Sequence, residues 1–208
     1  MALLRTAYFG GSFDPPHNGH IALAKAVIEL DLADEVWLSA AYIPPHKQRR
    51  LSDFSDRLAM LELACRGLEK ILPCGIEEQL KLNPSYTSEV MAELRRRYPE
   101  REFILLIGED MLTSFHLWNN AGELLRDYRI ICYPRGDGER ASLSELRQHW
   151  SDGEAEKLLG SLLNDLPVYN ISSTKIREAV AKNENVANCI DKEVYRYIKE
   201  NGLYRKEN

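Results

Sequence analysis

Short apolar runs alternate along this chain with segments whose apolar residues recur every three or four positions. The first pattern is typical of buried strands and the second of amphipathic helices. Strand-like runs occupy residues 4–11, 35–42, 102–108, 129–136 and 166–170, and helical patterns occupy residues 19–33, 53–70, 86–98, 121–128, 172–183 and 191–204. Because short connections join the two patterns in alternation, the sequence predicts an α/β fold, a doubly wound parallel sheet with helices on both faces.

Glycines end two of these strand-like runs, at Gly10–Gly11 and at Gly108. Parallel sheets of this kind bind ligands beyond the carboxyl ends of their strands, near the point where the strand order reverses. Glycine also lets the backbone approach a ligand closely. The two strand exits are therefore the candidate edges of a ligand site.

The chain has 208 residues, of which 44% are hydrophobic, and this length suits one domain with a sizeable core. Residues 137–165 are polar and helix-like, and we expect them to form an excursion from the main fold rather than a linker. Leu146 and Trp150 of this segment fit a helical packing face. Residues 171–208 are expected to form the C-terminal helices of the same 1–208 domain.

Composition argues against several classes of protein. Apolar runs are too short and interrupted to span a membrane, and Arg5 breaks the early apolar stretch that a secretory signal would need. The net charge of −5 argues against broad contact with nucleic acid. The four cysteines lie far apart without a C-x-x-C pair, which favours reduced, buried thiols over disulfides or a cysteine zinc site. We therefore expect a cytoplasmic protein that binds neither membranes nor nucleic acid.

The segment GGSFDPPHNGH (10–20) follows the first strand and enters a helix. The N-terminus of a helix presents free backbone N–H groups and the positive end of its dipole, both of which favour phosphate. His17 and His20 lie three positions apart and so share one face, where they can donate hydrogen bonds to charge on a phosphoryl oxygen. Asp14 precedes two prolines and can brace the turn. We prefer this interpretation to a plain glycine turn that happens to carry two histidines.

A metal site is the competing use of the two histidines. His-x-x-His offers two zinc ligands, but it lacks the spacing of H-E-x-x-H, and a third ligand is missing nearby unless the fold returns His46 to the site. We therefore expect no metal held by protein side chains.

A second motif of this kind, YNISSTKIREAV, runs from residue 169 to residue 180. Ser172, Ser173 or Thr174 can cap the helix that follows, and Arg177 can hold a phosphate through two parallel hydrogen bonds. An ordinary capped helix with solvated charges is the alternative, and this motif alone would favour it.

Two further segments leave strands at the same edge. YIPPHKQRR (42–50) carries a basic run, for which a solvated loop is the default interpretation. Within it, Lys47 is the cation that we place near an anionic substrate. In IGEDMLTSFHLWNN (107–120), Asp110 can bind a ribose hydroxyl, and Trp118 can stack on a planar ring or pack in the core. On the residues alone, the core is the better expectation for Trp118.

Several motifs occur in one fixed order between Gly10 and Tyr204: GGSFDPPHNGH, PPHK, NPSYT, IGEDML, Trp118, ISSTKIR and VYRYIKENGLY. In this set and order the chain resembles the nicotinate-nucleotide adenylyltransferases, within the HxGH nucleotidyltransferase superfamily. The resemblance implies a Rossmann-like fold and transfer of AMP from ATP to nicotinate mononucleotide, which gives deamido-NAD and pyrophosphate in NAD biosynthesis. ATP and the mononucleotide would be its small-molecule partners, with Mg²⁺ accompanying ATP.

The resemblance also implies roles for individual residues. His17, His20 and Arg177 would be catalytic, because in such enzymes the mononucleotide's phosphate attacks the α-phosphorus of ATP directly. The ATP-binding residues would be Gly10, Gly11, Ser12, Phe13, Gly108, Asp110, Ile171, Ser172, Ser173 and Thr174. The mononucleotide-binding residues would be Asp14, Lys47, Tyr86, Thr87, Trp118 and Arg135.

The chain departs from the family pattern mainly on the acceptor side. Tyr133 stands where arginine is usual, Asn170 replaces a frequent aspartate, and the second tryptophan often found soon after Trp118 is missing. Nicotinamide mononucleotide and phosphopantetheine are therefore the alternative acceptors, and a catalytically silent nucleotide-binding regulator is the alternative from another class. The sequence leaves a homo-oligomer open, with residues 137–165 as a candidate interface.

Overall fold

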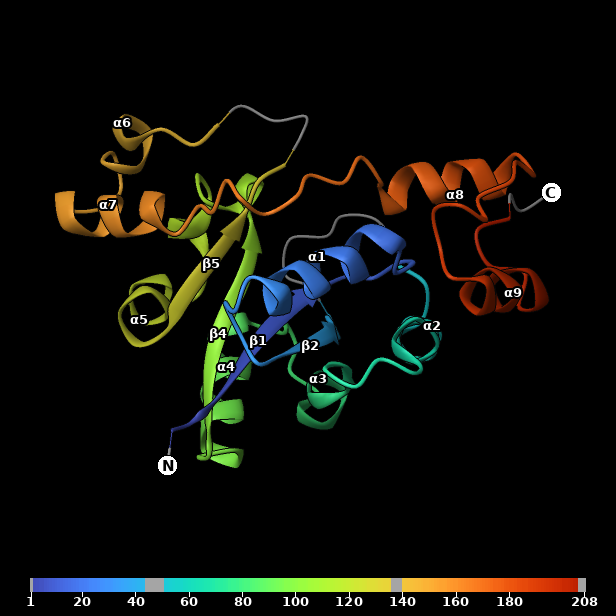
Figure 1. The fold of residues 1–208 in the computed structure, drawn as a ribbon, viewed down its shortest axis with the longest axis horizontal. Coiled ribbons are helices and arrows are strands. Elements are labelled where there is room, and N and C mark those ends of the chain that lie inside the picture. Colours follow the sequence, from blue (N-terminus) through green and yellow to red (C-terminus); the bar gives the residue numbers. More distant parts are fainter. Residues whose placement is uncertain (1, 44–50, 136–139, 206–208) are drawn as a thin grey trace.

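The computed structural model describes residues 2–43, 51–135 and 140–205. Within these residues, five parallel strands form one sheet in the order β3-β2-β1-β4-β5 (Figure 1). The strands are β1 (Leu4–Gly11), β2 (Glu35–Ala40), β3 (Ile71–Cys74), β4 (Arg101–Gly108) and β5 (Arg129–Tyr133). The strand order reverses between β1 and β4, so the carboxyl ends of these two strands define the switch point. The α/β, Rossmann-like class predicted from the sequence is confirmed.

Helices cover both faces of the sheet. In the described ranges they are α1 (Asn18–Glu29), α2 (Phe54–Cys65), α3 (Ile76–Leu80), α4 (Thr87–Arg97), α5 (Ala121–Asp127), α6 (Leu143–Leu146), α7 (Asp152–Gly160), α8 (Ser173–Ala181) and α9 (Lys192–Glu200). Two short 3-10 helices, Glu109–Met111 and Phe115–Leu117, follow β4. Helix α1 crosses one face of the sheet, and α4 lies behind the other (Figure 1).

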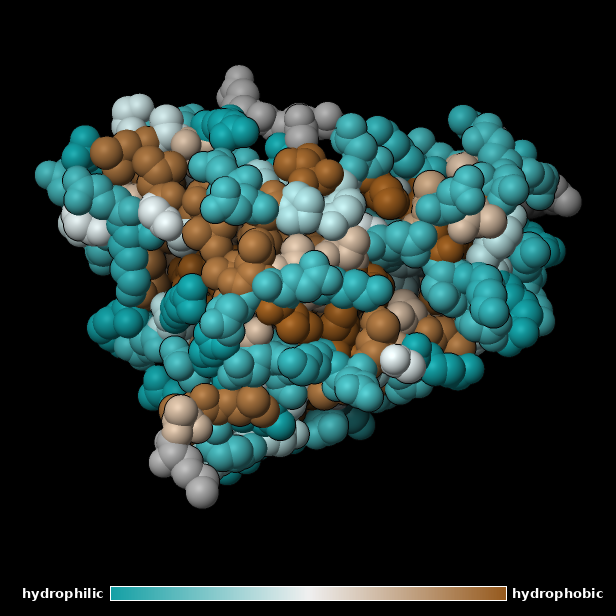
Figure 2. Space-filling view, viewed as in Figure 1, coloured by the Kyte–Doolittle hydropathy of each residue, from teal (hydrophilic) through white to brown (hydrophobic). Residues whose placement is uncertain are grey.

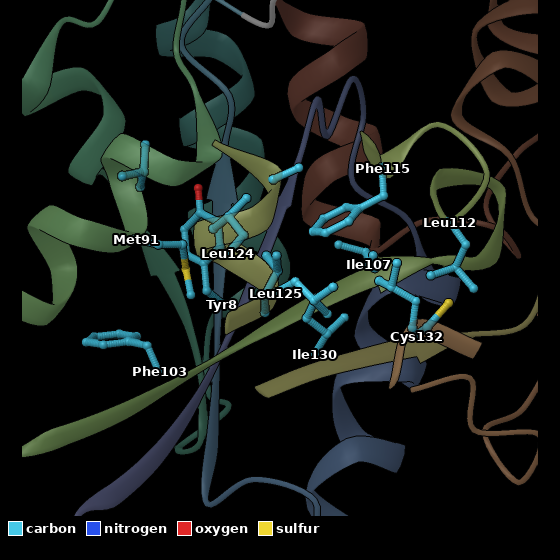
Figure 3. Packing of buried hydrophobic residues seen from close by; sticks show 14 of the residues in the cluster. Tyr8, Met91, Phe103, Ile107, Leu112, Phe115, Leu124, Leu125, Ile130 and Cys132 are labelled. Atoms are coloured by element: carbon cyan, nitrogen blue, oxygen red, sulfur yellow. The ribbon is translucent and has the colours of Figure 1, made fainter. Parts of the chain in front are cut away.

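Successive residues of the central strands enter different halves of the core, because side chains alternate along a strand. Ala7 and Phe9 pack with α1 and α2, whereas Tyr8 between them packs with α4. The same alternation sends Ile104 to the α1 side and Leu105 to the α4 side. The α4-side cluster, seen in Figure 3, includes Tyr8, Met91, Phe103, Ile107, Leu124 and Cys132. Burial on both faces explains why these strands are nearly continuous apolar runs.

The expected strand over residues 166–170 is wrong, because the segment has no strand pairing. Pro167 has no N–H to donate to a ladder, and the neighbouring Leu166 turns into the core instead. The edge of β5 is occupied by an earlier residue, Leu162, which forms an isolated bridge with Cys132.

The helix expected over residues 53–70 is shorter than its pattern. It ends at Cys65, and Gly67 then adopts a left-handed conformation with φ of 79°. The residues that follow form β3 and α3, which the sequence did not predict. A four-residue strand and a five-residue helix are too short to show a periodic pattern.

The 137–165 excursion contains α6 and α7, which lie at one end of the sheet beside β5 (Figure 1). Leu146 is buried and Trp150 packs against the same α4-side cluster, as predicted, but α6 ends at Leu146 and Trp150 lies in the turn after it, so the two do not share one helical face. The described part of the excursion therefore packs against the main core and enlarges it.

Helices α8 and α9 form a third apolar cluster with α2, around Met60, Ile176 and Ile198. On the face drawn in Figure 2, polar residues dominate around α8 and α9, and apolar residues gather toward the middle. None of the helices in the described part of the chain is long and apolar enough to cross a membrane.

Candidate active site

Two cavities share part of their walls at the carboxyl ends of β1, β4 and β5. The first, which we call the large cavity, has a volume of about 330 Å³, and its lining includes Ser85 and Trp118. The second, which we call the polar cavity, has a volume of about 210 Å³ and lies between the 10–20 turn and the start of α8. Arg135 lines both cavities. A ligand that fills one and reacts with a ligand in the other would therefore meet it beside Arg135.

The two histidines of the first motif are held by the start of α1. His17 is the N-cap residue of this helix, and its backbone N–H donates to Nδ1 of His20 at 3.1 Å. Because a neutral imidazole has one donor and one acceptor nitrogen, this bond places the proton of His20 on Nε2. The two rings stack with centroids 3.5 Å apart and 15° between their planes. His20 is therefore an Nε2–H donor on a fixed ring that lines the polar cavity.

Both imidazoles are neutral at physiological pH. Burial lowers the pKa of His17 to about 4, and the charge of Arg135 acts in the same direction. Burial, with the charges of His17 and Arg135, also holds the pKa of His20 well below its ordinary value. In the described chain, Nδ1 of His17 is buried and has no hydrogen-bond partner. A buried polar atom without a partner in a cavity wall favours a polar ligand there.

The second motif meets the first across the polar cavity. Helix α8 begins at Ser173, and the hydroxyl of its N-cap residue Ser172 accepts a long hydrogen bond from the backbone N–H of Lys175 (3.5 Å). The hydroxyl of Ser173 donates to the carbonyl of Pro15 at 2.9 Å, across 158 positions of sequence. The fold thus brings a helix N-terminus against the histidine turn, which the sequence could indicate only through resemblance.

Arg177 and Asp14 brace this contact. Nη1 of Arg177 donates to the backbone carbonyl of Asp14 at 2.7 Å, and Nη2 donates to the hydroxyl of Thr174 at 3.0 Å. The carboxylate of Asp14 is buried and accepts from the hydroxyl of Tyr204 at 2.7 Å. Asp14 lies in the wall of the polar cavity, whereas the resemblance implies a mononucleotide contact for it. Its position fits the turn-bracing role that the prolines around it predict.

An ion pair stands over the end of β4. Nε of Arg135 lies 3.2 Å from Oδ1 of Asp110. A Cβ at Gly108 would lie 2.3 Å from that carboxylate oxygen, so glycine leaves room for the Asp110 side chain to lie against this strand exit. Nη2 of Arg135 also donates to the hydroxyl of Tyr133 at 3.3 Å, and the guanidinium lies 5.5 Å from that ring's centre. The pair forms one charged group where the two cavities adjoin.

The lining of the large cavity includes an indole ring and the start of a helix. Trp118 is half-buried, and its ring lies 5.2 Å from that of Phe115. Helix α4 begins at Thr87 with Tyr86 as its N-cap residue, and both residues line the cavity. A planar face and free N–H groups of a first helical turn thus line the same cavity.

Four further residues expected to bind ATP line the polar cavity: Gly10, Gly11, Ser12 and Phe13. Phe13 packs edge-on against the His20 ring, with centroids 4.9 Å apart. Ile171 packs on the third cluster and also lines a smaller hollow beside the histidines. Lys47, the remaining candidate, lies outside the described residues.

Buried charged residues at this site include two that the sequence analysis did not single out. Arg57 of α2 is buried, and its Nη1 donates to the carbonyls of Ser12 (3.0 Å) and Ala41 (2.7 Å), which joins the ends of β1 and β2. Glu77 of α3 is buried and lines the large cavity. Charged residues in an amphipathic pattern are expected on the solvated face, so no local signal marks either residue.

Within the described ranges, no group of three or more His, Cys, Asp or Glu could hold a metal ion, and His46, the third ligand considered from the sequence, lies outside them. The carboxylate that lines the polar cavity, Asp14, already accepts from Tyr204. Mg²⁺ prefers oxygen ligands and keeps several waters. This donor set fits an Mg²⁺ coordinated by a ligand's phosphates and by water better than one enclosed by side chains.

The fold and the site together define a class of protein. A parallel α/β sheet carries, at its switch point, neutral imidazole donors, an arginine and the start of a nine-residue helix around one polar cavity. Helix N-termini and such switch points are where phosphate-bearing ligands bind. The class is that of nucleotide-binding α/β proteins.

Residues 8–179 match the cytidylyltransferase-like family. The nicotinate-nucleotide adenylyltransferase of Bacillus subtilis is 33% identical over 199 residues, which cover 94% of this chain and 96% of that protein. The chain therefore belongs to the nicotinate-nucleotide adenylyltransferase family, within the cytidylyltransferase-like proteins, as the motif order predicted.

Solved structures show the same fold. The nicotinic acid mononucleotide adenylyltransferase of Plasmodium falciparum, complexed with NaAD, matches with a TM-score of 0.75 at 19% identity, and the match covers 97% of each chain. A second structure of the Plasmodium falciparum enzyme, complexed with APC, matches with a TM-score of 0.71 at 18% identity and the same coverage of 97%. At these identities the likeness concerns the fold.

Proposed function

We propose that this chain transfers AMP from ATP to nicotinate mononucleotide, and so produces deamido-NAD and pyrophosphate in NAD biosynthesis. The observation that carries the proposal is the shared wall of the two cavities, where Arg135 lies beside the neutral histidine pair. A cavity of about 330 Å³ with an aromatic wall suits a mononucleotide, and the polar cavity suits the phosphates of ATP. The family to which the chain belongs supports the same reaction.

In the proposed reaction, a phosphate oxygen of the mononucleotide attacks the α-phosphorus of ATP. A new P–O bond joins the acceptor to the α-phosphorus, the bond to the α,β-bridging oxygen breaks, and its electron pair leaves with pyrophosphate. A phosphate monoester is largely ionised at neutral pH, so the attack requires no general base. Catalysis then depends on positioning and on stabilising charge in the transition state.

His17 and His20 donate hydrogen bonds to oxygens of the reacting phosphates in this account. The Nε2–H of His20 is preorganised by the bond at its Nδ1, and such fixed donors stabilise developing charge without reorganisation. Arg177, Ser173 and Thr174 hold the β- and γ-phosphates at the start of α8, where backbone N–H groups add to the attraction.

We assign the large cavity to the mononucleotide. Trp118 offers its face to the pyridine ring, and the N–H groups at Tyr86 and Thr87 receive the ring's carboxylate. Lys47, outside the described residues, is proposed to contact the mononucleotide's phosphate.

Arg135 stands between the two substrates. We propose that it binds the mononucleotide's phosphate. Gly108 and Asp110 line the large cavity and not the polar one, and we propose that the adenosine contacts them beside Arg135, where the two cavities share a wall. On binding, the ion pair between Asp110 and Arg135 would then be replaced by two contacts with ligands, one made by each side chain.

Mg²⁺ is proposed to accompany ATP. When bound, it neutralises part of the triphosphate's negative charge, with phosphate oxygens and water as its ligands. The chain's own part is to hold those phosphates at the polar cavity. We place the reaction in the cytoplasm, where free thiols such as those of the buried Cys65, Cys74 and Cys132 persist.

The proposal is tested by measuring pyrophosphate release with Mg-ATP and, in parallel, nicotinate mononucleotide, nicotinamide mononucleotide or phosphopantetheine. We expect strong turnover with the nicotinate form. Preference for another acceptor would keep the histidine chemistry and overturn the assignment of the large cavity. ATP binding without release for any acceptor would favour the silent regulator.

A further inference from the structure

Glu77 is a buried carboxylate in the wall of the large cavity that the proposed mechanism does not use. It is 4% exposed and is the second residue of the short helix α3. Burial raises the pKa of its carboxyl, although neighbouring donors act in the opposite direction. A buried acid is costly unless its oxygens are hydrogen-bonded. Its partners therefore show what the fold uses it for.

Within the described residues, donors from three separate segments meet this carboxylate. The hydroxyl of Tyr8, in β1, donates to Oε1 at 2.6 Å. The backbone N–H of Tyr42, beyond the end of β2, donates to Oε2 at 2.9 Å. The hydroxyl of Ser85, in the turn before α4, donates to the same oxygen. Glu77 thus joins two strand ends to that turn.

The turn held by Glu77 carries the residues assigned to the acceptor. Ser85 is followed directly by Tyr86 and Thr87, which line the large cavity at the start of α4. The backbone N–H of Ser85 also donates to the carbonyl of Ile43 at 2.9 Å, so the turn is fixed from two sides. Loss of the carboxylate would leave the second contact alone to place the turn.

The loop that carries Trp118 is linked to the same helix start. The hydroxyl of Ser88, in the first turn of α4, donates to Oδ1 of Asn119 at 2.8 Å. Asn119 is the neighbour of Trp118 in the loop after β4. A shift of the turn before α4 would therefore also reach the loop that carries Trp118, whereas none of the three described donors to the Glu77 carboxylate lines the polar cavity.

We propose that Glu77 is a positioning residue that holds the Ser85–Thr87 turn in the shape that receives the mononucleotide, and that it acts on acceptor affinity without acting on ATP affinity. The inference rests on the proposed function, since it assigns the large cavity to the acceptor. The carboxylate contributes by accepting three hydrogen bonds at once. It is therefore a determinant of acceptor binding that touches the binding turn rather than the reacting atoms.

Glutamine tests this role because it keeps the size of glutamate. Its amide keeps one accepting oxygen for the N–H of Tyr42 and the hydroxyl of Ser85, and its N–H₂ group then requires the hydroxyl of Tyr8 to accept instead of donate. Because the charge is removed in either orientation, three charge-assisted bonds become neutral ones, and for Glu77→Gln we expect the KM for nicotinate mononucleotide to rise about tenfold. The KM for ATP and kcat should stay within about twofold of the wild-type values. Glu78→Gln, at the exposed neighbouring position, is the matched control and should change neither constant.

Ser85→Ala provides a second, milder variant that removes one of the three donors. It should raise the same KM by a smaller factor, and the Glu77→Gln/Ser85→Ala double variant should be no worse than Glu77→Gln alone, because both changes break one network. Thermal unfolding of each variant shows whether it folds. If Glu77→Gln does not fold, the acceptor KM of Ser85→Ala tests the positioning role instead.

The outcomes separate this inference from the proposed function. Wild-type protein that fails to use nicotinate mononucleotide overturns both. Active wild type with an unchanged acceptor KM in Glu77→Gln, or a parallel rise in the KM values of both substrates, overturns the inference alone. Multiplying effects of the two substitutions would also contradict it.

Discussion

The polar cavity and the large cavity are built from the chain in different ways. Most of the polar cavity comes from two short contiguous segments, each a turn that leads into a helix. The large cavity takes its residues from several distant segments, including β1, α3, the turn before α4 and the loop after β4. In the proposed assignment, the phosphates of ATP meet two turns that are each built locally and joined by the fold, whereas the acceptor meets residues from many separate segments.

This difference divides the expected effects of substitutions. Changes around the polar cavity should reduce turnover or ATP use, and changes around the large cavity should act on acceptor affinity. A substitution at one cavity that changes the kinetic constants of the other cavity's substrate would show that the two cavities do not serve separate substrates.

His20→Ala should have the largest effect. Removing a preorganised donor to the transition state typically reduces kcat about 10²–10³-fold, and the affinity for ATP should change little. Steady-state kinetics with a separate ATP-binding titration would measure both quantities. His149→Ala, at an exposed position, is the control. Parallel losses in kcat and ATP affinity would count against a transition-state role for His20.

Arg177→Lys should reduce kcat/KM for ATP by about 10–100-fold, because lysine cannot replace a planar group that makes charge-assisted bonds in two directions. In the structure the guanidinium reaches both the carbonyl of Asp14 and the hydroxyl of Thr174. Arg147→Lys changes an exposed ion-paired arginine in the excursion and should be silent. A fully active Arg177→Lys enzyme would sink the assignment of this side chain to the ATP phosphates.

Trp118→Ala should raise the KM for the mononucleotide about tenfold, since the indole face that packs on the ring is removed, and should spare the KM for ATP. Leu117→Ala, at the 67% exposed position next to it, is a matched control expected to behave as wild type. If the acceptor KM does not move in Trp118→Ala, this side chain belongs to the core alone.

The smallest effect concerns stability and pH. The pKa of His17 is about 4 in the folded chain and near 6.5 when unfolded, so the unfolded state binds the proton first as the pH falls. The contribution of His17 to stability should therefore decrease from pH 7 downward and level off below pH 4, with a loss of about 1 kcal/mol between pH 7 and pH 5.5. Urea unfolding at the two pH values measures this loss. His17→Gln should reduce the slope, and an unchanged slope would show that the ring is not buried in its neutral form.

What the sequence predicted follows the same division between local and distant structure. The turn with His17 and His20 and the cap around Ser173 are contiguous, so their helix starts could be recognised from residue types alone. The β1, β4 and β5 strands were found because burial on both faces makes them long apolar runs.

The parts that the sequence did not predict depend on contacts between distant segments. Glu77 sits in a polar stretch that looks solvated, and only the approach of Tyr8 and Ser85 explains its burial. The strand β3 is too short to show periodicity, and the 166–170 run lost its expected strand because Pro167 cannot donate to a ladder. In each case the residue whose contact determines the structure lies elsewhere in the chain, or the local pattern is too short to predict a helix or strand.

The most direct test of the account is a crystal structure of this chain with deamido-NAD. The account expects the nicotinate ring in the large cavity against Trp118, with the diphosphate beside Nε2 of His20 and the guanidinium of Arg135. A dinucleotide whose nicotinate ring lies outside the large cavity, or whose diphosphate lies away from the histidine pair, would contradict the claim that the two cavities meet at one reaction centre.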